Sequence, residues 1–215
     1  MQAALQWCRS TFEALRVPSA RPQRALKRQT DLVLGIALLI LTAPLVAIAA
    51  VLVRLNGPGP VIFRQTRVGL DGREFEVFKL RSMIADAEQN TGPIWAAQND
   101  ARVTAVGRIL RKYRIDELPQ LVNVLNGEMS LVGPRPERPA FVQQLSESIP
   151  HFELRTRVLP GITGLAQIET GYGRSRADSE EKLKHDMEYV RSASVTLDLL
   201  ILMRTIRVVL RGAGR

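Results

Sequence analysis

At 215 residues the chain is long enough for one domain with a substantial core, or for a small domain plus a membrane element. Its formal net charge of +9 predicts an anionic partner, which leaves nucleic acid, phospholipid headgroups and phosphorylated substrates open. The single cysteine, Cys8, excludes an internal disulfide framework, and with only two histidines the chain has too few ligands for an ordinary zinc site.

An apolar segment runs from Leu32 to Val53 without a charged residue and is long enough to span hydrocarbon. It lies too far into the chain, and its apolar core is too long, for a cleaved signal peptide. Pro44 interrupts it, and basic residues flank both of its ends, so both ends favour the cytoplasmic side. We expect a re-entrant helix that breaks at Thr42, Ala43 and Pro44, where the Thr42 hydroxyl bonds a freed carbonyl; a spanning helix is the alternative.

The next stretches read as a hairpin and a surface helix. After the breaker cluster NGPGP, residues 61–80 alternate apolar and polar side chains around a Gly-Leu-Asp-Gly turn, which predicts strands from Val61 to Arg67 and from Glu74 to Leu80. Residues 84–104 show no steady period and are expected to be loop or short helix. Residues 106–114, VGRILRKYR, place apolar side chains at helical spacing among basic ones, which is typical of a helix on a membrane surface.

Two acids stand side by side in RIDELPQL, residues 114–121. The apolar residues that follow have helical spacing, so a helix is expected to start at about Asp116, and a plain helix start is the simplest interpretation. A helix N-terminus also suits phosphate, and its dipole is expected to keep Asp116 ionised. Because neighbouring side chains on a helix point about 100° apart, Asp116 and Glu117 are expected to take different roles, one attacking or binding metal and the other positioning a metal or taking a proton.

Later motifs are each open to two interpretations. In GPRP, residues 133–136, the prolines hold Arg135 extended, which either presents a planar donor fork to phosphate or forms a rigid turn with a solvated arginine. The glycines of LPGITG, residues 159–164, permit positive φ and close approach to a ligand, or make an ordinary turn. Residues 180–190 are expected to be a solvated helix. Residues 197–215 predict an interfacial helix or a core helix with one wet side.

Three of these stretches stand in the order and at the spacing of one family: VIFRQTRVGLDGREFEVFKLRSM, RKYRIDELPQLVNVLNGEMSLVGPRP and LPGITGLAQI. From Asp31 to Leu210 the chain resembles the bacterial sugar transferases of the monotopic phosphoglycosyl transferase family. The implied fold is mixed α/β and mostly helical. It comprises a basic N-terminal segment (1–30), a re-entrant membrane helix (31–55) and a cytoplasmic membrane-associated catalytic domain (56–215) with a small β-hairpin and interfacial amphipathic helices.

The resemblance implies transfer of a sugar 1-phosphate from a UDP-sugar to a polyprenyl phosphate such as undecaprenyl phosphate, with release of UMP. This would be the first membrane step of exopolysaccharide or other glycoconjugate synthesis. Asp116 would be the nucleophile that forms a phosphosugar-aspartate intermediate, and Glu117 would complete the dyad. Mg²⁺ is the implied cofactor, with Asp116 and Glu117 as its ligands. The residues implied to bind the substrate are Lys79, Arg81, Arg111, Pro134, Arg135 and Pro136.

The implied location is the bacterial inner membrane, with the catalytic domain on the cytoplasmic face, in contact with membrane lipid and without nucleic acid; a homo-oligomer stays open. The sequence departs from the family at three places. Ala43-Pro44 replaces the common Ser-Pro, Leu165 stands where many members have tryptophan, and Glu169 to Arg174 differ in a region expected to contact the sugar. Without the long multi-span N-terminal region of larger relatives, a small single-anchor type is expected.

Three other functions compete with this one. A membrane-surface adaptor would bind acidic lipids through its arginines and tolerate loss of Asp116. A nucleic-acid binder is suggested by net charge alone, and the aromatic content of 5% disfavours it. A membrane phosphatase would use Asp116 with water in place of the lipid acceptor, and analysis of the products separates it from a transferase.

Overall fold

The computed structural model describes residues 21–85, 87–88, 92, 100–170 and 176–212. Cys8, the first 20 residues of the predicted basic segment and residues 171–174 of the predicted sugar-contacting stretch lie outside the described residues. The remainder is mostly helical with two small sheets, which confirms the predicted mixture of secondary structure.

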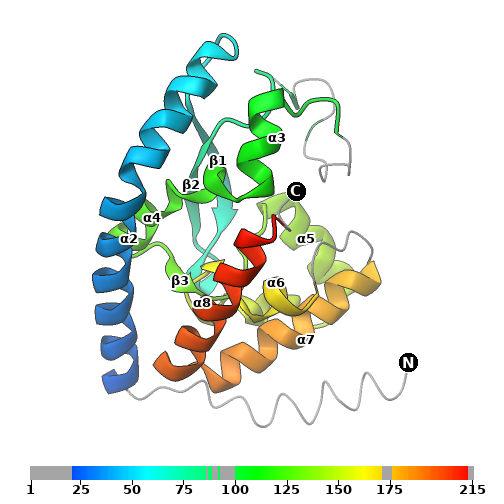
Figure 1. Ribbon diagram of the computed structural model, residues 1–215. Coiled ribbons are helices and arrows are strands. Elements are labelled where there is room, and N and C mark those ends of the chain that lie inside the picture. The colour runs from blue at the N-terminus through cyan, green and yellow to red at the C-terminus, as the bar shows by residue number, and fades with distance from the viewer. Residues whose placement is uncertain (1–20, 86, 89–91, 93–99, 171–175, 213–215) are drawn as a thin grey trace.

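One long helix, α2 (Arg21–Leu55), forms a side of the molecule (Figure 1). It carries Pro44 in its interior, so the predicted break at Thr42, Ala43 and Pro44 is not formed, and the helix continues through these residues. A proline removes only one backbone donor, and the hydrogen bonds on either side of it keep a long helix intact. The Thr42 hydroxyl donates to the carbonyl of Leu38 at 2.7 Å, rather than to the carbonyl that Pro44 leaves without its donor.

Both ends of α2 pack on the rest of the protein. Its N-terminal half contacts α4 (Gln120–Asn126) and α8 (Val195–Leu210). Its C-terminal half contacts β2 (Glu74–Leu80) and α3 (Ala105–Lys112) through a small core of Ala49, Val53, Leu80 and Leu110. Between these contacts many apolar side chains are exposed, among them Ile40, Leu41 and Ile48. The helix is long and apolar enough to cross a membrane by length and composition.

The predicted hairpin is confirmed, with its first strand one residue later than expected. Strand β1 (Ile62–Val68) pairs antiparallel with β2, with Ile62 opposite Leu80 and Val68 opposite Glu74. The connecting 3-10 turn, η1 (Leu70–Gly72), holds Asp71 at φ 51° and Gly72 at φ 78°, both in the left-handed region.

The motifs GPRP and LPGITG, which read as separate turns, lie side by side. Strand β3 (Ser130–Val132) pairs in parallel with β4 (Gly161–Thr163), and the two backbones continue to bond where the strands end, from Gly133 N to Thr163 O at 2.9 Å. A Cβ on Gly161 would lie 2.1 Å from Gly133 N. These glycines are therefore required by the close approach of two backbones, and not by positive φ.

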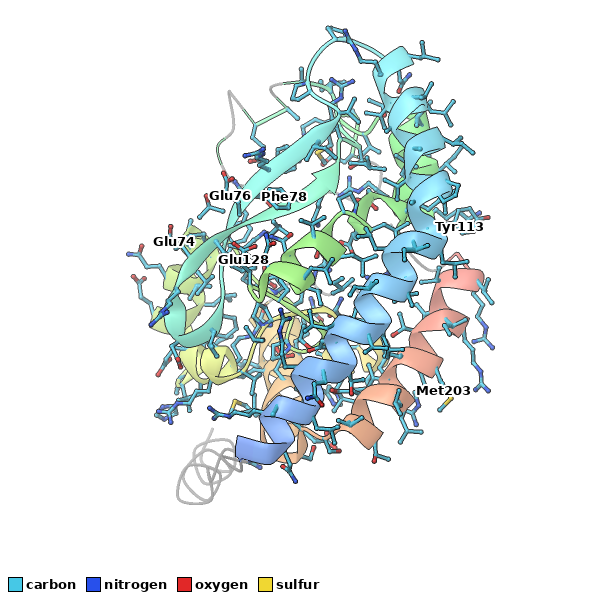
Figure 2. All side chains as sticks on the ribbon, turned by 90° about the vertical axis from the view of Figure 1, so that its left-hand side faces the viewer. Glu74, Glu76, Phe78, Tyr113, Glu128 and Met203 are labelled. Atoms are coloured by element: carbon cyan, nitrogen blue, oxygen red, sulfur yellow. The ribbon has the colours of Figure 1, made fainter. Side chains whose placement is uncertain are left out.

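The C-terminal half forms a second core. It is built by α5 (Pro139–Ser148), the 3-10 segment η3 (Phe152–Arg157) and α7 (Arg176–Ser192). The short α6 (Leu165–Glu169) packs instead against the core that contains Val132 and Tyr189. Helix α7 buries Leu183 and Met187 in this core, so the predicted solvated helix is wrong: its apolar positions, sparse in sequence, share one face. Helix α8 buries Ile201 but exposes Met203, which points outward in Figure 2.

Candidate active site

The two adjacent acids lie in a 3-10 turn, η2 (Ile115–Glu117), and not in the first turn of the helix that follows. The α-helix α4 begins only at Gln120, after Pro119. Arg114, just before the turn, has φ 55°, and this left-handed residue reverses the chain after α3. The turn buries both acids, leaving Asp116 7% and Glu117 6% exposed, while their surroundings come from several elements.

Glu117 is surrounded by cations. Its carboxylate accepts a hydrogen bond from Lys79 Nζ at 3.1 Å and two hydrogen bonds from the Arg135 guanidinium. It also forms an ion pair with Arg114 at 3.7 Å. Burial by itself would raise the pKa of Glu117. The charges of Arg135 and Lys79, with the hydrogen bond from Arg135, outweigh burial and hold that pKa well below its usual value. Glu117 is therefore ionised, and both of its oxygens are occupied.

Asp116 is in the opposite situation. In the part of the chain that the structure describes, its carboxylate has no hydrogen-bond or ion-pair partner. Burial and the neighbouring Glu117 charge raise its pKa to about 6, against the opposing influence of Lys79, Arg111 and Arg135. The expected lowering of its pKa by a helix dipole is not seen, because the acid precedes α4 in a 3-10 turn and burial dominates its pKa. A pKa of about 6 still leaves Asp116 mostly ionised at pH 7.

The structure brings five of the predicted site residues together: Asp116, Glu117, Lys79, Arg111 and Arg135. Arg81 belongs elsewhere. Its guanidinium donates to the carbonyls of Val53 at 2.9 Å, Gly57 at 2.8 Å and Pro58, where it caps the C-terminal end of α2. Alternation along β2 places Lys79 and Arg81 on one face, but the end of α2 lies beside only the second of them.

Pro134 and Pro136 flank Arg135, and all three residues line a pocket that also contacts the turn of the hairpin at Val68 and Gly69. Its polar edges come from Arg135, Glu137, Arg155 and Thr156, and its apolar walls include Pro134, Pro136, Val142, Phe152 and Pro160. Arg155 donates to the backbone carbonyl of Arg135 at 2.9 Å and pairs with the buried Asp186 at 2.7 Å. The loop that presents Arg135 to Glu117 is thus fixed from behind.

Three arginines that contact Glu117 or the loop around Arg135 were not among the site residues predicted from the sequence. Arg114 pairs with Glu117, Arg155 holds the Arg135 backbone, and Arg67 donates to the carbonyl of Pro136 at 2.9 Å. Burial lowers the pKa of Arg67 to about 10. Arg114 lies two residues before Asp116, and this short distance in sequence could have indicated a contact with the acid pair. Arg67 and Arg155 come from distant segments, and no local sequence pattern marks them.

The donor set for a metal ion is smaller than expected. Among the described residues, no group of three or more His, Cys, Asp or Glu side chains is arranged to hold a metal. Glu117 does not fit the expected role of ligand, because Lys79 and Arg135 already occupy its oxygens. Asp116 fits it, since the described part of the chain gives its carboxylate no partner and Mg²⁺ commonly binds one or two carboxylates together with substrate phosphates.

Comparison with known proteins places the chain in a family. The model of the bacterial sugar transferase family matches residues 22–212. The chain is 46% identical over 189 residues to a UDP-N-acetylgalactosamine-undecaprenyl-phosphate N-acetylgalactosaminephosphotransferase of Aeromonas hydrophila, covering 88% of this chain and 44% of the relative. It is 44% identical over 191 residues to a UDP-glucose:undecaprenyl-phosphate glucose-1-phosphate transferase of Escherichia coli K12, covering 88% of this chain and 41% of the relative.

A third relative is nearer in size. It is an exopolysaccharide production protein of Rhizobium leguminosarum, 38% identical over 186 residues, with 84% of this chain and 93% of the relative covered. The chain spans less than half the length of the first two relatives. These matches confirm the resemblance to the family, while the relatives' names differ in the sugar at similar identity.

Proposed function

Because the chain belongs to the bacterial sugar transferase family, we propose that it transfers a sugar 1-phosphate from a UDP-sugar to undecaprenyl phosphate or a similar polyprenyl phosphate. UMP is the second product. The observation that carries this proposal is the contrast within the acid pair: Glu117 is held ionised by three cations, while Asp116 beside it has no hydrogen-bond or ion-pair partner among the described residues. One carboxylate organises the positive charge, and the other is available to react.

In the first half-reaction a carboxylate oxygen of Asp116 attacks the β-phosphorus of the donor. The bond from that phosphorus to the bridging oxygen breaks, and UMP leaves with the oxygen and its electron pair. Lys79, Arg111 and Arg135 lie close enough to act on the charge of Asp116, so they also offset the charge of a diphosphate bound there. The product on the enzyme is a phosphosugar-aspartate.

In the second half-reaction an oxygen of the polyprenyl phosphate attacks the same phosphorus. The bond to Asp116 breaks, the carboxylate is regenerated, and the polyprenyl diphosphate sugar is released. A magnesium ion bound with the donor supplies neutralisation of diphosphate charge, and Asp116 is the carboxylate that would hold it, with the donor's own oxygens. Glu117 keeps Lys79 and Arg135 in place through both steps.

The pocket beside Arg135 suits the nucleotide part of the donor. Its proline and phenylalanine walls offer flat apolar surface, and Arg135 lines it while also bonding Glu117. A donor with its base in this pocket has its diphosphate directed towards the cations around Glu117. The sugar then lies beyond Asp116, and the relatives' names give no single sugar to assign.

The packing of α2 supports placement at the cytoplasmic face of the bacterial inner membrane. One domain holds both ends of the helix: Arg28 bonds the carbonyls of Val124 and Leu125 near the start, and Arg81 bonds those of Val53 and Gly57 at the end. A helix held at both ends by one water-facing domain does not cross a bilayer. We therefore expect α2 to lie within one leaflet, bent near Pro44, with both ends on the domain's side.

The test is UMP release from a panel of UDP-sugars by the protein reconstituted in lipid with undecaprenyl phosphate and Mg²⁺. Wild type is compared with Asp116→Asn. Release that requires the lipid acceptor and Asp116, with a lipid-linked diphosphate sugar as the other product, supports the transferase. Release of sugar phosphate without a lipid product would indicate hydrolysis, and no release from any donor would contradict the proposed reaction.

A further inference from the structure

A buried amide covers the free edge of strand β2. One edge of β2 pairs with β1, while the opposite edge faces Asn123 of α4, which is fully buried. Asn123 Oδ1 accepts from Phe78 N at 3.1 Å, and its Nδ2 donates to the carbonyl of Glu76 at 2.7 Å. One side chain therefore makes the two bonds that a neighbouring strand would make at this position.

The amide is held in a single orientation. Its Nδ2 also donates to Glu128 Oε2 at 2.8 Å, and the backbone carbonyl of Asn123 accepts from the backbone N–H of Glu128 at 3.0 Å. Figure 2 shows Glu128 close to the hairpin residues Glu76 and Phe78. A rotated amide would turn an oxygen towards the carbonyl of Glu76 and the carboxylate of Glu128, so the observed orientation is strongly preferred.

Asn123 bonds β2 at Glu76 and Phe78, directly before the site residue Lys79. Lys79 follows Phe78 on β2, and its ammonium reaches Glu117, which lies in the turn that leads into α4. The α4 segment and β2 are thus joined at two points, at Asn123 and at the Lys79–Glu117 pair. Fixing the first point sets the position along the strand from which Lys79 reaches the second.

We infer that Asn123 is a positioning residue for the active site: by bonding the edge of β2, it places Lys79 against Glu117. Asn123 does not contact the site itself, so its effect passes through Lys79. The kinetic consequence rests on the proposed transferase function, whereas the geometric consequence does not.

The geometric consequence is tested on the free protein by reductive methylation with formaldehyde, followed residue by residue with mass spectrometry. Asn123→Ala should raise the methylation rate of Lys79 about fivefold relative to the exposed Lys112 in the same sample, because β2 loses the bonds that hold Lys79 against Glu117. The matched control is Thr205→Val, which removes a hydrogen bond to Thr163 away from β2 and should leave the ratio unchanged.

A milder variant keeps this test decisive if Asn123→Ala does not fold. Glu128→Ala removes the acceptor that orients the amide while leaving both bonds to β2 possible, and the Glu128 side chain is only partly buried. It should raise the Lys79 rate in the same direction, about twofold. An unchanged Lys79 rate in whichever variant folds would overturn the inference.

The kinetic consequence is tested by a double-mutant cycle on the kcat for UMP release. We expect Asn123→Ala to lower kcat about 10-fold and Lys79→Met about 30-fold, with the double variant no slower than about 30-fold. Multiplied losses near 300-fold would show a general structural role and contradict positioning through Lys79. If wild type releases no UMP, the proposed function fails, and the methylation result still decides the role of Asn123.

Discussion

Two buried clusters of acids and bases in this protein differ in their charge balance. At the start of α2, Lys27 lies 2.6 Å from Asp198 and 4.0 Å from Asp31, and the hydroxyl of Tyr189 donates to Asp198 at 2.7 Å. Asp31 accepts from the backbone N–H of Leu131 at 3.1 Å. Each acid in this anchor cluster, which consists of Lys27, Asp31, Tyr189 and Asp198, has a partner within the protein.

Around η2 the balance is different. Lys79, Arg111, Arg114 and Arg135 act on two carboxylates, and within residues 21–85, 87–88, 92, 100–170 and 176–212 Glu117 accepts hydrogen bonds while Asp116 accepts none. Positive charge therefore exceeds negative charge in a buried place, which is unfavourable until an anion arrives. The comparison indicates that the anchor cluster stabilises the fold, whereas the η2 cluster has the excess of positive charge that the proposed diphosphate donor would offset.

The largest effect is expected from neutralising one acid in each cluster. Asp116→Asn should lower UMP release by about 1,000-fold or more, because an amide cannot form the intermediate. The matched variant Asp198→Asn keeps the shape of another buried acid and should retain kcat within about twofold, while losing about 1 to 3 kcal/mol of stability. Equal losses of activity in both variants would contradict the distinction between the clusters.

Asp116→Asn should also leave the protein at least as stable as wild type. The folded pKa of Asp116 is about 6, above the ordinary value of 3.8, so the folded state binds the proton more tightly than the unfolded state does. The resulting contribution to stability is present below about pH 4 and is lost as the pH rises through 6. At pH 7 the wild type should therefore be less stable than the variant by about 1 to 3 kcal/mol in urea unfolding.

The pH dependence of activity gives the next largest effect. If ionised Asp116 attacks the donor, kcat/KM should fall about tenfold for each unit below pH 6, the pKa of the free enzyme. The charge of Glu117 helps to raise that pKa, so Glu117→Gln should move the acidic limb to lower pH while reducing the maximum rate. An unmoved limb would show that a group other than Asp116 titrates.

Local patterns in the sequence predicted the parts of the structure that local interactions determine. The alternation across residues 61–80 predicted the hairpin, because cross-strand pairing around a tight turn depends on neighbouring residues alone. The acid pair with Lys79, Arg111 and Arg135 was expected from the family motifs, and the structure gathers these residues. The opposite pKa shifts of Asp116 and Glu117 were not predictable, because they depend on burial and on cations from three other segments.

Long-range contacts account for the differences. Strands β3 and β4 are three residues each, and nothing in either segment indicates that they pair. Arg81 was expected to bind substrate phosphate because it matches a basic position of the family, but the end of α2, which is remote in sequence, supplies its partners. An arginine in the sequence thus indicated a side chain able to bind oxygen atoms, but only the fold determined which oxygen atoms Arg81 binds.

Substitution of Arg81 and of Arg135 therefore tests which arginine stabilises the fold and which one serves the proposed reaction. Arg81→Ala should lower the free energy of unfolding by about 2 to 4 kcal/mol, because three carbonyls at the end of α2 lose a shared charged donor. The kcat of the folded fraction should change less than threefold. The matched variant Arg135→Ala should do the reverse, with a large loss of kcat and a smaller loss of stability. Glu117 keeps two other cationic partners, Lys79 and Arg114, when Arg135 is removed.

The smallest effect is expected at an ion pair outside both clusters. Arg204 on α8 bonds Glu169 on α6 at 2.7 Å, but their side chains are 61% and 41% exposed. Water already solvates both charges, and ordering two long side chains offsets much of the attraction, so Arg204→Ala should lower the free energy of unfolding by at most about 1 kcal/mol. That loss should shrink further in 1 M salt, where charges are screened within about 3 Å, whereas the loss in Lys27→Met at the largely buried anchor should persist. If salt reduced the loss of unfolding free energy equally in the Lys27 and Arg204 variants, the anchor cluster would be as solvated as the surface pair. Its contrast with the η2 cluster would then rest on charge balance alone.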